Sequence, residues 1–176
     1  MKVVLIAGGA GSGKTYLGKK IVELAKEQGL WALQTEYSKY IKMYAHEILG
    51  FNGDSENKPR SFLQNTGSFI REELHDEMFF IRRMLEDFRV YEKYFDIVVI
   101  SDVRLLPEIE EMIEFPYEVT TILVRNEHPQ RVLTEEEKNH VTEHEFRKYL
   151  DYDYVVNNKE IGILDNAAKT ILEEIK

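Results

Sequence analysis

Unbroken apolar runs alternate along the chain with stretches whose apolar residues recur at helical spacing. Val3 to Ala7 is one such run, and it is followed by glycines and then by Leu17, Ile21 and Leu24 on one helical face. This pattern predicts a buried strand, a glycine-rich turn and a helix that closes near Gly29. A second run, Ile97 to Ile100, is typical of a strand buried on both faces of a parallel sheet.

The rest of the chain continues the alternation of strands and helices. Shorter strands are expected at residues 31–34, 120–124 and 153–156, and helices at 41–50, 107–115 and 164–175. Apolar residues from 61 to 88 predict one long helix that is bent or broken early, near Gly67. This order predicts an α/β fold, in which helices cover both faces of a parallel sheet and ligands bind at the carboxyl ends of its strands.

Composition narrows the classes of protein that the chain can belong to. Its 176 residues, 43% of them hydrophobic, fit a single globular domain, and the lack of cysteine excludes disulfides and thiolate metal sites. A net charge of -9 argues against binding to long nucleic acid, which depends on lysines and arginines. The apolar runs are too short to cross a bilayer, and the first opens into glycines rather than a cleavage site. We therefore expect a cytoplasmic protein without nucleic acid or membrane partners.

One motif carries a specific chemistry. Residues 8 to 15 match G-x-x-x-x-G-K-[ST] between a predicted strand and a predicted helix, and they are Gly8, Gly9, Ala10, Gly11, Ser12, Gly13, Lys14 and Thr15. Such a loop turns its backbone N–H groups toward phosphate oxygens, next to the positive end of the helix. Lys14, expected to face solvent, would reach the β- and γ-phosphates of ATP, and the Thr15 hydroxyl would ligate Mg²⁺. A chance match in a chain of this length has a probability of about one per cent.

Asp102 and Arg104 follow the second buried run. An aspartate at the end of a strand beside the phosphate loop can hold the Mg²⁺ shell or orient the attacking oxygen, and an arginine can clamp a second phosphate. The alternative is a structural salt bridge at the strand end. The two side chains share a face only if the extended conformation continues as far as Arg104. We expect Lys14, Asp102 and Arg104 to be catalytic.

The segment D-V-R-L-L-P-E at residues 102–108 resembles the D-V-R-F-P-N-E segment of the deoxynucleoside monophosphate kinase family, part of the nucleoside monophosphate kinase-like group of P-loop proteins. Residues 37–42 resemble the family's F-A-D-P-L-K helix start, and residues 60–67, with Arg71 beyond them, resemble its R-x-x-L-Q-x-x-G segment. Residues 140–143 and 153–157 resemble its H-x-S-E and D-Y-V-I-x-N ending. The resemblance therefore spans nearly the whole chain.

The resemblance implies a P-loop fold with five parallel strands, an acceptor-binding insert at about 36–90 and a lid at about 126–150, all within one kinase domain of residues 1–176. It implies transfer of the γ-phosphoryl group of ATP to a (deoxy)nucleoside monophosphate or a nucleotide-like acceptor. The residues that would face the acceptor are Lys42, Arg60, Gln64, Arg71 and Arg104. On the donor side it places Asn157 and its neighbours beside the base and makes Arg125 and the catalytic Arg131 candidate lid arginines.

One departure from the family pattern leaves the acceptor open. Lys39 stands where the family has an acidic residue, close to the expected acceptor. Dephospho-coenzyme A and phosphomevalonate are alternative acceptors for kinases of this layout. A nucleotide-dependent switch protein is an alternative from another class, although the N-K-x-D motif that reads guanine is missing. The sequence is compatible with a monomer or a homodimer.

Residues 140 to 144 spell H-x-x-E-H, the signature of inverted zinc metalloproteases. Two histidines one helical turn apart can bind zinc, with Glu143 as general base. This interpretation lacks a downstream acidic ligand on an obvious helix and leaves the phosphate loop without a purpose. We therefore favour the kinase interpretation.

Overall fold

The computed structural model describes residues 1–53, 59–126, 134 and 139–176. The chain divides into two compact units, which are described separately below. The sheet unit consists of Met1–Glu36 and Arg89–Lys176, and the helical unit is Tyr37–Phe88. The insert expected from the sequence covers nearly the same residues as the helical unit, while its role in acceptor binding stays a prediction.

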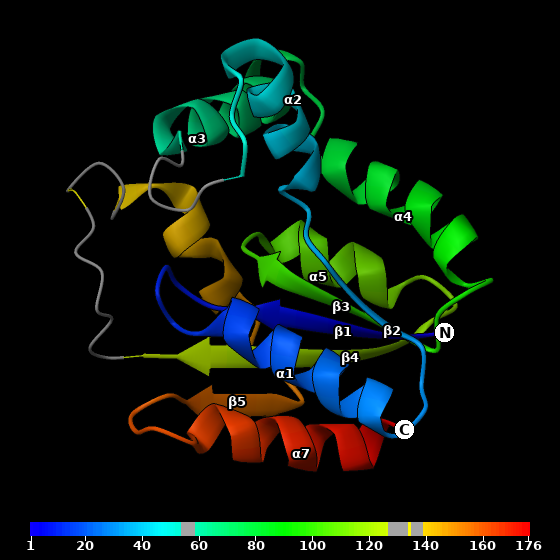
Figure 1. The fold of residues 1–176 in the computed structure, drawn as a ribbon. Coiled ribbons are helices and arrows are strands. Elements are labelled where there is room, and N and C mark those ends of the chain that lie inside the picture. Colours follow the sequence, from blue (N-terminus) through cyan, green and yellow to red (C-terminus); the bar gives the residue numbers. More distant parts are fainter. Residues whose placement is uncertain (54–58, 127–133, 135–138) are drawn as a thin grey trace. The chain divides into compact units, whose positions relative to one another are not determined.

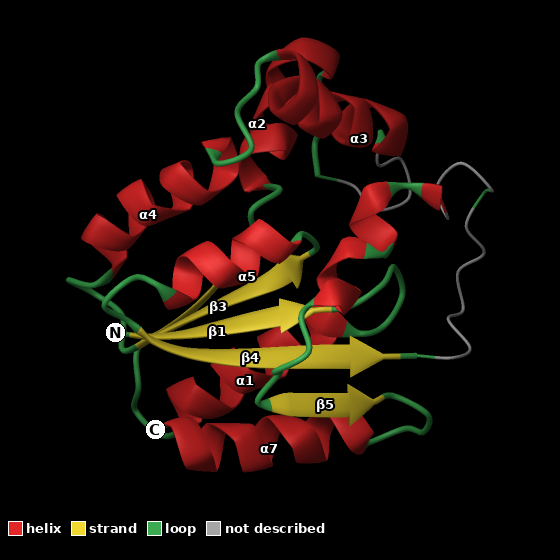
Figure 2. Ribbon diagram, turned by 180° about the vertical axis from the view of Figure 1, so that it is seen from behind, coloured by secondary structure: helices red, strands yellow, loops and turns green. Residues whose placement is uncertain are grey.

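As predicted, the sheet unit contains five parallel strands, and the structure shows their order to be β2-β3-β1-β4-β5 (Figure 1). The strands are β1 Lys2–Ala7, β2 Ala32–Thr35, β3 Ile97–Val103, β4 Glu118–Arg125 and β5 Tyr154–Asn157. Three α-helices of this unit are α1 Lys14–Glu27, α5 Leu106–Ile113 and α7 Ile163–Ile175. Figures 1 and 2 show α1 and α7 on one face of the sheet and α5 on the other.

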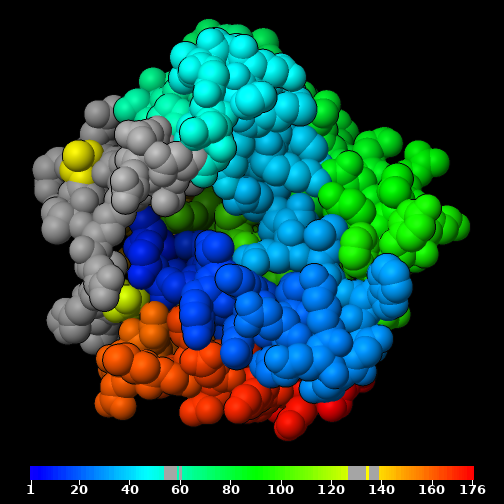
Figure 3. Space-filling view, in the orientation of Figure 1, coloured from blue at the N-terminus to red at the C-terminus, as the bar shows by residue number. Residues whose placement is uncertain are grey.

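The hydrophobic core explains why the first apolar run lacks alternation. Val3 to Ala7 of β1 are all buried, because β1 lies in the middle of the sheet with helices on both faces. On one face Val4 and Ile6 pack in a cluster with Leu17 and Ile21 of α1 and with residues of α7. The space-filling view shows the atoms of α1 and α7, blue and orange to red, lying over this face (Figure 3).

Strand register sets the level at which the chain leaves the sheet. Ala7 of β1 pairs with Val103 of β3 on one side and with Leu123 of β4 on the other. The phosphate loop, which begins at Gly8, therefore leaves the sheet at the same edge as Arg104. This edge is the carboxyl end of a parallel sheet, where α/β proteins place their ligands.

The helical unit is built from α2 Lys39–Leu49, α3 Arg60–Ser68, a π-helical turn Phe69–Glu73 and most of α4 Phe79–Tyr91. The sequence predicted one long helix that is bent or broken early, near Gly67. The helix does change there, from α3 to the π-helical turn, but the break in the chain lies further on. Gly67 lies inside α3, and the chain breaks at residues 74–78 instead. His75 adopts a positive φ of 52° there, and the Asp76 carboxylate accepts hydrogen bonds from Arg82 of α4.

None of the helices in the described part of the chain combines the length and the apolar composition that a bilayer crossing needs.

Replacing Gly18 of α1 with alanine tests how closely this helix packs against the sheet. A Cβ at this position would lie 2.8 Å from Nε2 of Gln34 and 3.1 Å from Cβ of Ser101, and Gln34 is fixed by two hydrogen bonds. Gly18→Ala should therefore lower the free energy of unfolding by about 1–2 kcal/mol, although alanine favours helices.

Gly67→Ala is the matched control in a helix. Its Cβ would meet only side chains, and the nearest is the flexible guanidinium end of Arg71 at 3.2 Å. This variant should be neutral or more stable by up to about 1 kcal/mol in urea unfolding. Equal effects of the two substitutions would contradict the packing described for Gly18.

Candidate active site

The phosphate loop is clamped between β4 and α7. Gly8 has a φ of 149°, and a Cβ there would lie 2.3 Å from the carbonyl oxygen of Val124. Gly13 has a φ of 104°, and its Cβ would lie 2.7 Å from Cδ1 of Leu164. Both backbone conformations favour glycine, and both close approaches leave no room for a side chain. The glycines of the motif thus fix the path of the loop across the sheet edge.

Ser12 and Lys14 are buried polar residues of the loop. The Lys14 side chain is buried, not solvent-facing as the sequence had indicated, with the residue only 6% exposed. Its Nζ donates hydrogen bonds of 2.7 Å to the carbonyl oxygens of Gly8 and Gly9. Ser12 is 3% exposed, and its hydroxyl finds no hydrogen-bond partner among the described residues. A buried unsatisfied hydroxyl inside a glycine-rich loop is the group that a phosphate oxygen would satisfy.

Two asparagines brace the loop from the neighbouring strands. Nδ2 of Asn158, just after β5, donates to the carbonyl oxygen of Ser12 at 3.0 Å. Nδ2 of Asn126, just after β4, donates to the carbonyl oxygen of Gly11 at 3.3 Å. The sequence analysis placed Asn157 and its neighbours beside the donor base. Asn157 is exposed at the end of β5, and its neighbour Asn158 makes the contact with the loop. The expected donor residue Arg125 is exposed at the end of β4.

The expected metal ligands come from the first turn of α1 and from β3. Thr15 is exposed near the start of α1, and Asp102 is partly buried in β3. Gln34 of β2 links these elements, because its Nε2 donates to the Thr15 carbonyl oxygen at 3.0 Å and to the Ser101 Oγ at 2.8 Å. The described residues contain no group of three or more His, Asp or Glu side chains that would hold a metal by themselves. Phosphate oxygens normally complete such a Mg²⁺ shell.

Arg104 is held by both its backbone and its side chain. Its backbone N–H and that of Leu105 donate to Oε2 of Glu108, at 2.7 and 3.0 Å, which caps the start of α5. Its guanidinium Nη1 donates to Oε1 of Glu143 at 2.6 Å and to the Thr142 carbonyl oxygen at 3.3 Å. The strand β3 extends through Asp102 to Val103, so the extended conformation reaches the residue before Arg104.

Glu143 connects Arg104 to the phosphate loop. Its other oxygen, Oε2, accepts a hydrogen bond of 2.8 Å from the backbone N–H of Ala10. The side chain of Glu143 is 13% exposed. Sequence reasoning placed Glu143 only in a family motif or in a zinc signature, and it did not foresee this contact. The H-x-S-E motif of the resembling family and the H-x-x-E-H signature were the signals in the sequence that singled out Glu143.

The local structure does not support the zinc signature. His140 precedes a 3₁₀ turn, Val141–Glu143. Its ring nitrogen Nδ1 accepts a hydrogen bond of 3.3 Å from the backbone N–H of Thr142. His144 follows the turn rather than lying one α-helical turn further on the same helix. Glu143, the expected general base, is instead bound to Arg104 and Ala10.

Comparisons with known proteins bear on the fold. No family model matches the chain, and no curated protein matches it. Among solved structures, shikimate kinase from Aquifex aeolicus vf5 is similar with a TM-score of 0.52 and 13% identity, over 98% of this chain and 95% of that chain. The chain has the fold of a P-loop kinase.

Two further structures are similar at lower TM-scores. One is an APS kinase from Mycobacterium tuberculosis, with a TM-score of 0.49 and 12% identity over 98% of this chain and 94% of that chain. The other is shikimate kinase from Bacteroides thetaiotaomicron, with a TM-score of 0.48 and 16% identity over 99% of this chain and 98% of that chain. None of the three structures is a deoxynucleoside monophosphate kinase, so that part of the resemblance stays a proposal.

Of the residues expected at the acceptor, Arg104 lies in the sheet unit and the others lie in the helical unit. Lys42 is on α2, Gln64 on α3 and Arg71 in the π-helical turn. Arg131 and the side chain of Arg60 lie outside the described residues. The structure thus places Lys42, Gln64 and Arg71 on separate helical elements of one unit.

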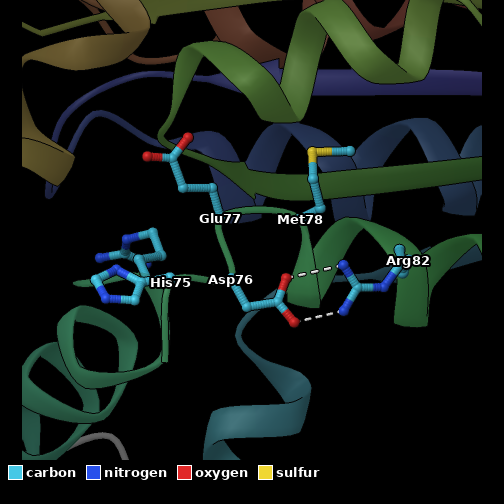
Figure 4. Close-up of a pocket in the computed structure, with 6 residues that line it drawn as sticks. His75, Asp76, Glu77, Met78 and Arg82 are labelled. Atoms are coloured by element: carbon cyan, nitrogen blue, oxygen red, sulfur yellow. Dashed lines mark hydrogen bonds and ion pairs between the residues drawn. The ribbon is translucent and has the colours of Figure 1, made fainter. Parts of the chain in front are cut away.

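Arg71 lines an open cavity of about 420 Å³ within this unit, together with His75, Asp76, Glu77, Met78 and Arg82 (Figure 4). Asp76 accepts two hydrogen bonds from the Arg82 guanidinium, at 2.8 and 2.5 Å. These hydrogen bonds hold the pKa of Asp76 below its ordinary value, because they favour the carboxylate.

Lys39, the departure from the family pattern, is paired inside the helical unit. Its ammonium group and the hydroxyl of Tyr40 both donate to Oδ2 of Asp87 on α4. The guanidinium of Arg83 lies over the Tyr40 ring, 4.9 Å from its centroid. Asp87 therefore supplies, from another helix, a negative charge next to the lysine that replaces the family's acid.

Proposed function

We propose that the protein is an ATP-dependent phosphotransferase that moves the γ-phosphoryl group of ATP to a (deoxy)nucleoside monophosphate or a nucleotide-like acceptor. The observation that carries this proposal is the complete phosphate loop at the carboxyl edge of a P-loop kinase sheet, with the buried Lys14 ammonium and the unsatisfied Ser12 hydroxyl inside it. Buried groups of this kind cost free energy unless a ligand compensates them.

The residues of the sheet unit divide the work at the donor phosphates. Backbone N–H groups of the loop and Lys14 bind and neutralise phosphate oxygens, and Lys14 exchanges its carbonyl partners for them. Thr15 and Asp102 would hold Mg²⁺, which neutralises negative charge on the phosphates when it is bound. Asn126 and Asn158 keep the loop in shape by binding its carbonyl groups.

The reaction needs positioning and charge neutralisation rather than a covalent enzyme intermediate. An acceptor oxygen forms a bond to the γ-phosphorus, the bond from that phosphorus to the β,γ-bridging oxygen breaks, and ADP leaves. Asp102 either stays with the metal or receives the proton of the acceptor oxygen. Arg104, at the same edge of the sheet, would clamp the phosphate of the acceptor with its forked guanidinium.

Support for a phosphorylated acceptor comes from the cations of the helical unit. Lys42 and Arg71 match the positions of the resembling family, and Arg71 lines a cavity. Lys39 is engaged by Asp87, so this departure does not add an unpaired positive charge to the unit. These features favour an acceptor of the same charge type as a nucleoside monophosphate.

A non-nucleotide acceptor is the second candidate. The similar structure from Aquifex aeolicus is named for shikimate, which is not a nucleotide. Shikimate, dephospho-coenzyme A and phosphomevalonate therefore belong in an acceptor screen beside nucleoside and deoxynucleoside monophosphates. A switch protein would bind the nucleotide and transfer phosphate to none of them.

Replacing Lys14 tests the donor side. Lys14→Ala should lower turnover by about a thousandfold, because it removes a preorganised charge from the transferred phosphate. Turnover is measured with the acceptor that the screen identifies. Lys19→Ala is the matched control on α1, because its side chain is 72% exposed and pairs only weakly with Glu23. Lys14→Ala activity within about tenfold of the unmodified protein would show that the phosphate loop does not act as proposed.

Replacing Arg104 tests the acceptor side. Arg104→Lys keeps the charge but loses the forked guanidinium, so it should raise the acceptor KM and lower kcat while ATP affinity stays nearly unchanged. Asp102→Asn should instead lower kcat and alter the Mg²⁺ dependence. Each variant should lose about 2–4 kcal/mol of transition-state stabilisation.

The two effects are separated by titrating a fluorescent ATP analogue alongside steady-state kinetics. Weakened ATP binding with an unchanged acceptor KM in Arg104→Lys would move Arg104 to the donor side.

A further inference from the structure

The Glu143 carboxylate binds two groups that would bind phosphate in the proposed function, the Ala10 N–H and the Arg104 guanidinium. Oε2 of Glu143 accepts the Ala10 N–H at 2.8 Å, and Oε1 accepts Nη1 of Arg104 at 2.6 Å. A carboxylate that accepts a hydrogen bond from a loop N–H and another from an arginine has the same chemistry as a phosphate oxygen pair. In this structure Glu143 stands in for phosphate at the loop.

The backbone that carries Glu143 is fastened to the end of β3. The Phe146 N–H donates to the Arg104 carbonyl oxygen at 3.0 Å, and Phe146 is 3% exposed. The Tyr152 hydroxyl donates to the Phe146 carbonyl oxygen at 2.7 Å. Burial raises the pKa of Tyr152, so the phenol keeps the proton that it donates. These hydrogen bonds hold the backbone next to Glu143 independently of the contact between Glu143 and Ala10.

A carboxylate and a phosphate oxygen cannot both take the same N–H. They compete for one donor, and their like charges repel at short range in a partly buried site. A phosphate that binds at Ala10 must displace Glu143, and the Arg104 guanidinium then loses the carboxylate that holds it.

We propose that Glu143 is a built-in competitor for phosphate at the Ala10 N–H, and that it retains Arg104 until bound phosphate displaces it. The inference rests on the proposed function, because it presumes that the loop binds nucleotide phosphate. It makes the affinity for nucleotide lower than the loop alone would give. It also makes Arg104 available to the reaction only when the loop is filled.

The test compares the unmodified protein with Glu143→Gln and Glu145→Gln. Glutamine keeps the shape of the side chain but removes the charge that repels phosphate and binds Arg104. Glu145 is the matched control, because it lies two residues further along and its carboxylate pairs with the exposed Lys148. Calorimetry with a non-hydrolysable ATP analogue and Mg²⁺ measures the affinity. Glu143→Gln should bind the analogue about tenfold more tightly, and Glu145→Gln should bind it like the unmodified protein.

A second measurement does not depend on nucleotide binding. The amide proton resonance of Ala10 in an NMR spectrum of the nucleotide-free protein should shift in Glu143→Gln and stay in place in Glu145→Gln, because only Glu143 accepts that N–H.

The outcomes separate the inference from the proposed function. If Glu143→Gln binds the analogue no more tightly than Glu145→Gln, Glu143 does not compete with phosphate and the inference is overturned. An Ala10 resonance that is unchanged in Glu143→Gln overturns it as well. If the unmodified protein and both variants all fail to bind the analogue, the proposed function fails, and the Ala10 resonance still decides whether Glu143 occupies the loop.

Discussion

Parallel pairing of β1 with both β3 and β4 is the constraint on which the rest of the site depends. Because Ala7 is level with Val103 and with Leu123, three segments leave the sheet at one edge. These segments carry the phosphate loop, Arg104 and the loop-bracing Asn126. The register between β1 and β3 shifts by one residue between Leu5 and Ala7, and this irregularity brings Val103 level with Ala7 at the end of the two strands.

The second feature of the site is a local balance of charge in an acidic protein. The chain has a net charge of -9, yet Lys14 and Arg104 lie at one edge of the sheet. Carbonyl groups of the loop and the Glu143 carboxylate satisfy these cations in the structure. In the proposed function, phosphate oxygens would take the place of these carbonyl and carboxylate partners, so the affinity for nucleotide would depend on this local exchange rather than on the overall charge.

The sequence alone predicted the elements whose evidence is local. Val3–Ala7 is continuous and apolar because β1 is buried on both faces, and the glycines after it are required by the close approaches at Gly8 and Gly13. The break between α3 and α4 was misplaced because Leu74, Met78 and Ile81 keep helical spacing across it. Asp76, a residue type that favours helix starts, was the signal in the sequence for the true break.

The hydrophobic pattern and the motifs of the sequence did not predict contacts between residues that are far apart in the chain. Ala10 and Glu143 are separated by 133 positions, and Glu143 lies in a charged segment without apolar periodicity. Likewise, nothing local links Lys39 with Asp87, whose contact depends on how α2 packs against α4. Such pairs are determined by tertiary structure, so the sequence supplies the residue types but not their partners.

The central claim is that this phosphate loop transfers a phosphoryl group to a small-molecule acceptor. Phosphorus NMR of the protein with ATP, Mg²⁺ and each acceptor in turn follows the substrate and the products in one spectrum. The account predicts that, with one acceptor, ADP appears in equal amount with a new phosphorylated product, for a nucleoside monophosphate the diphosphate. Loss of ATP to ADP and inorganic phosphate alone, or no reaction with any acceptor, would contradict it.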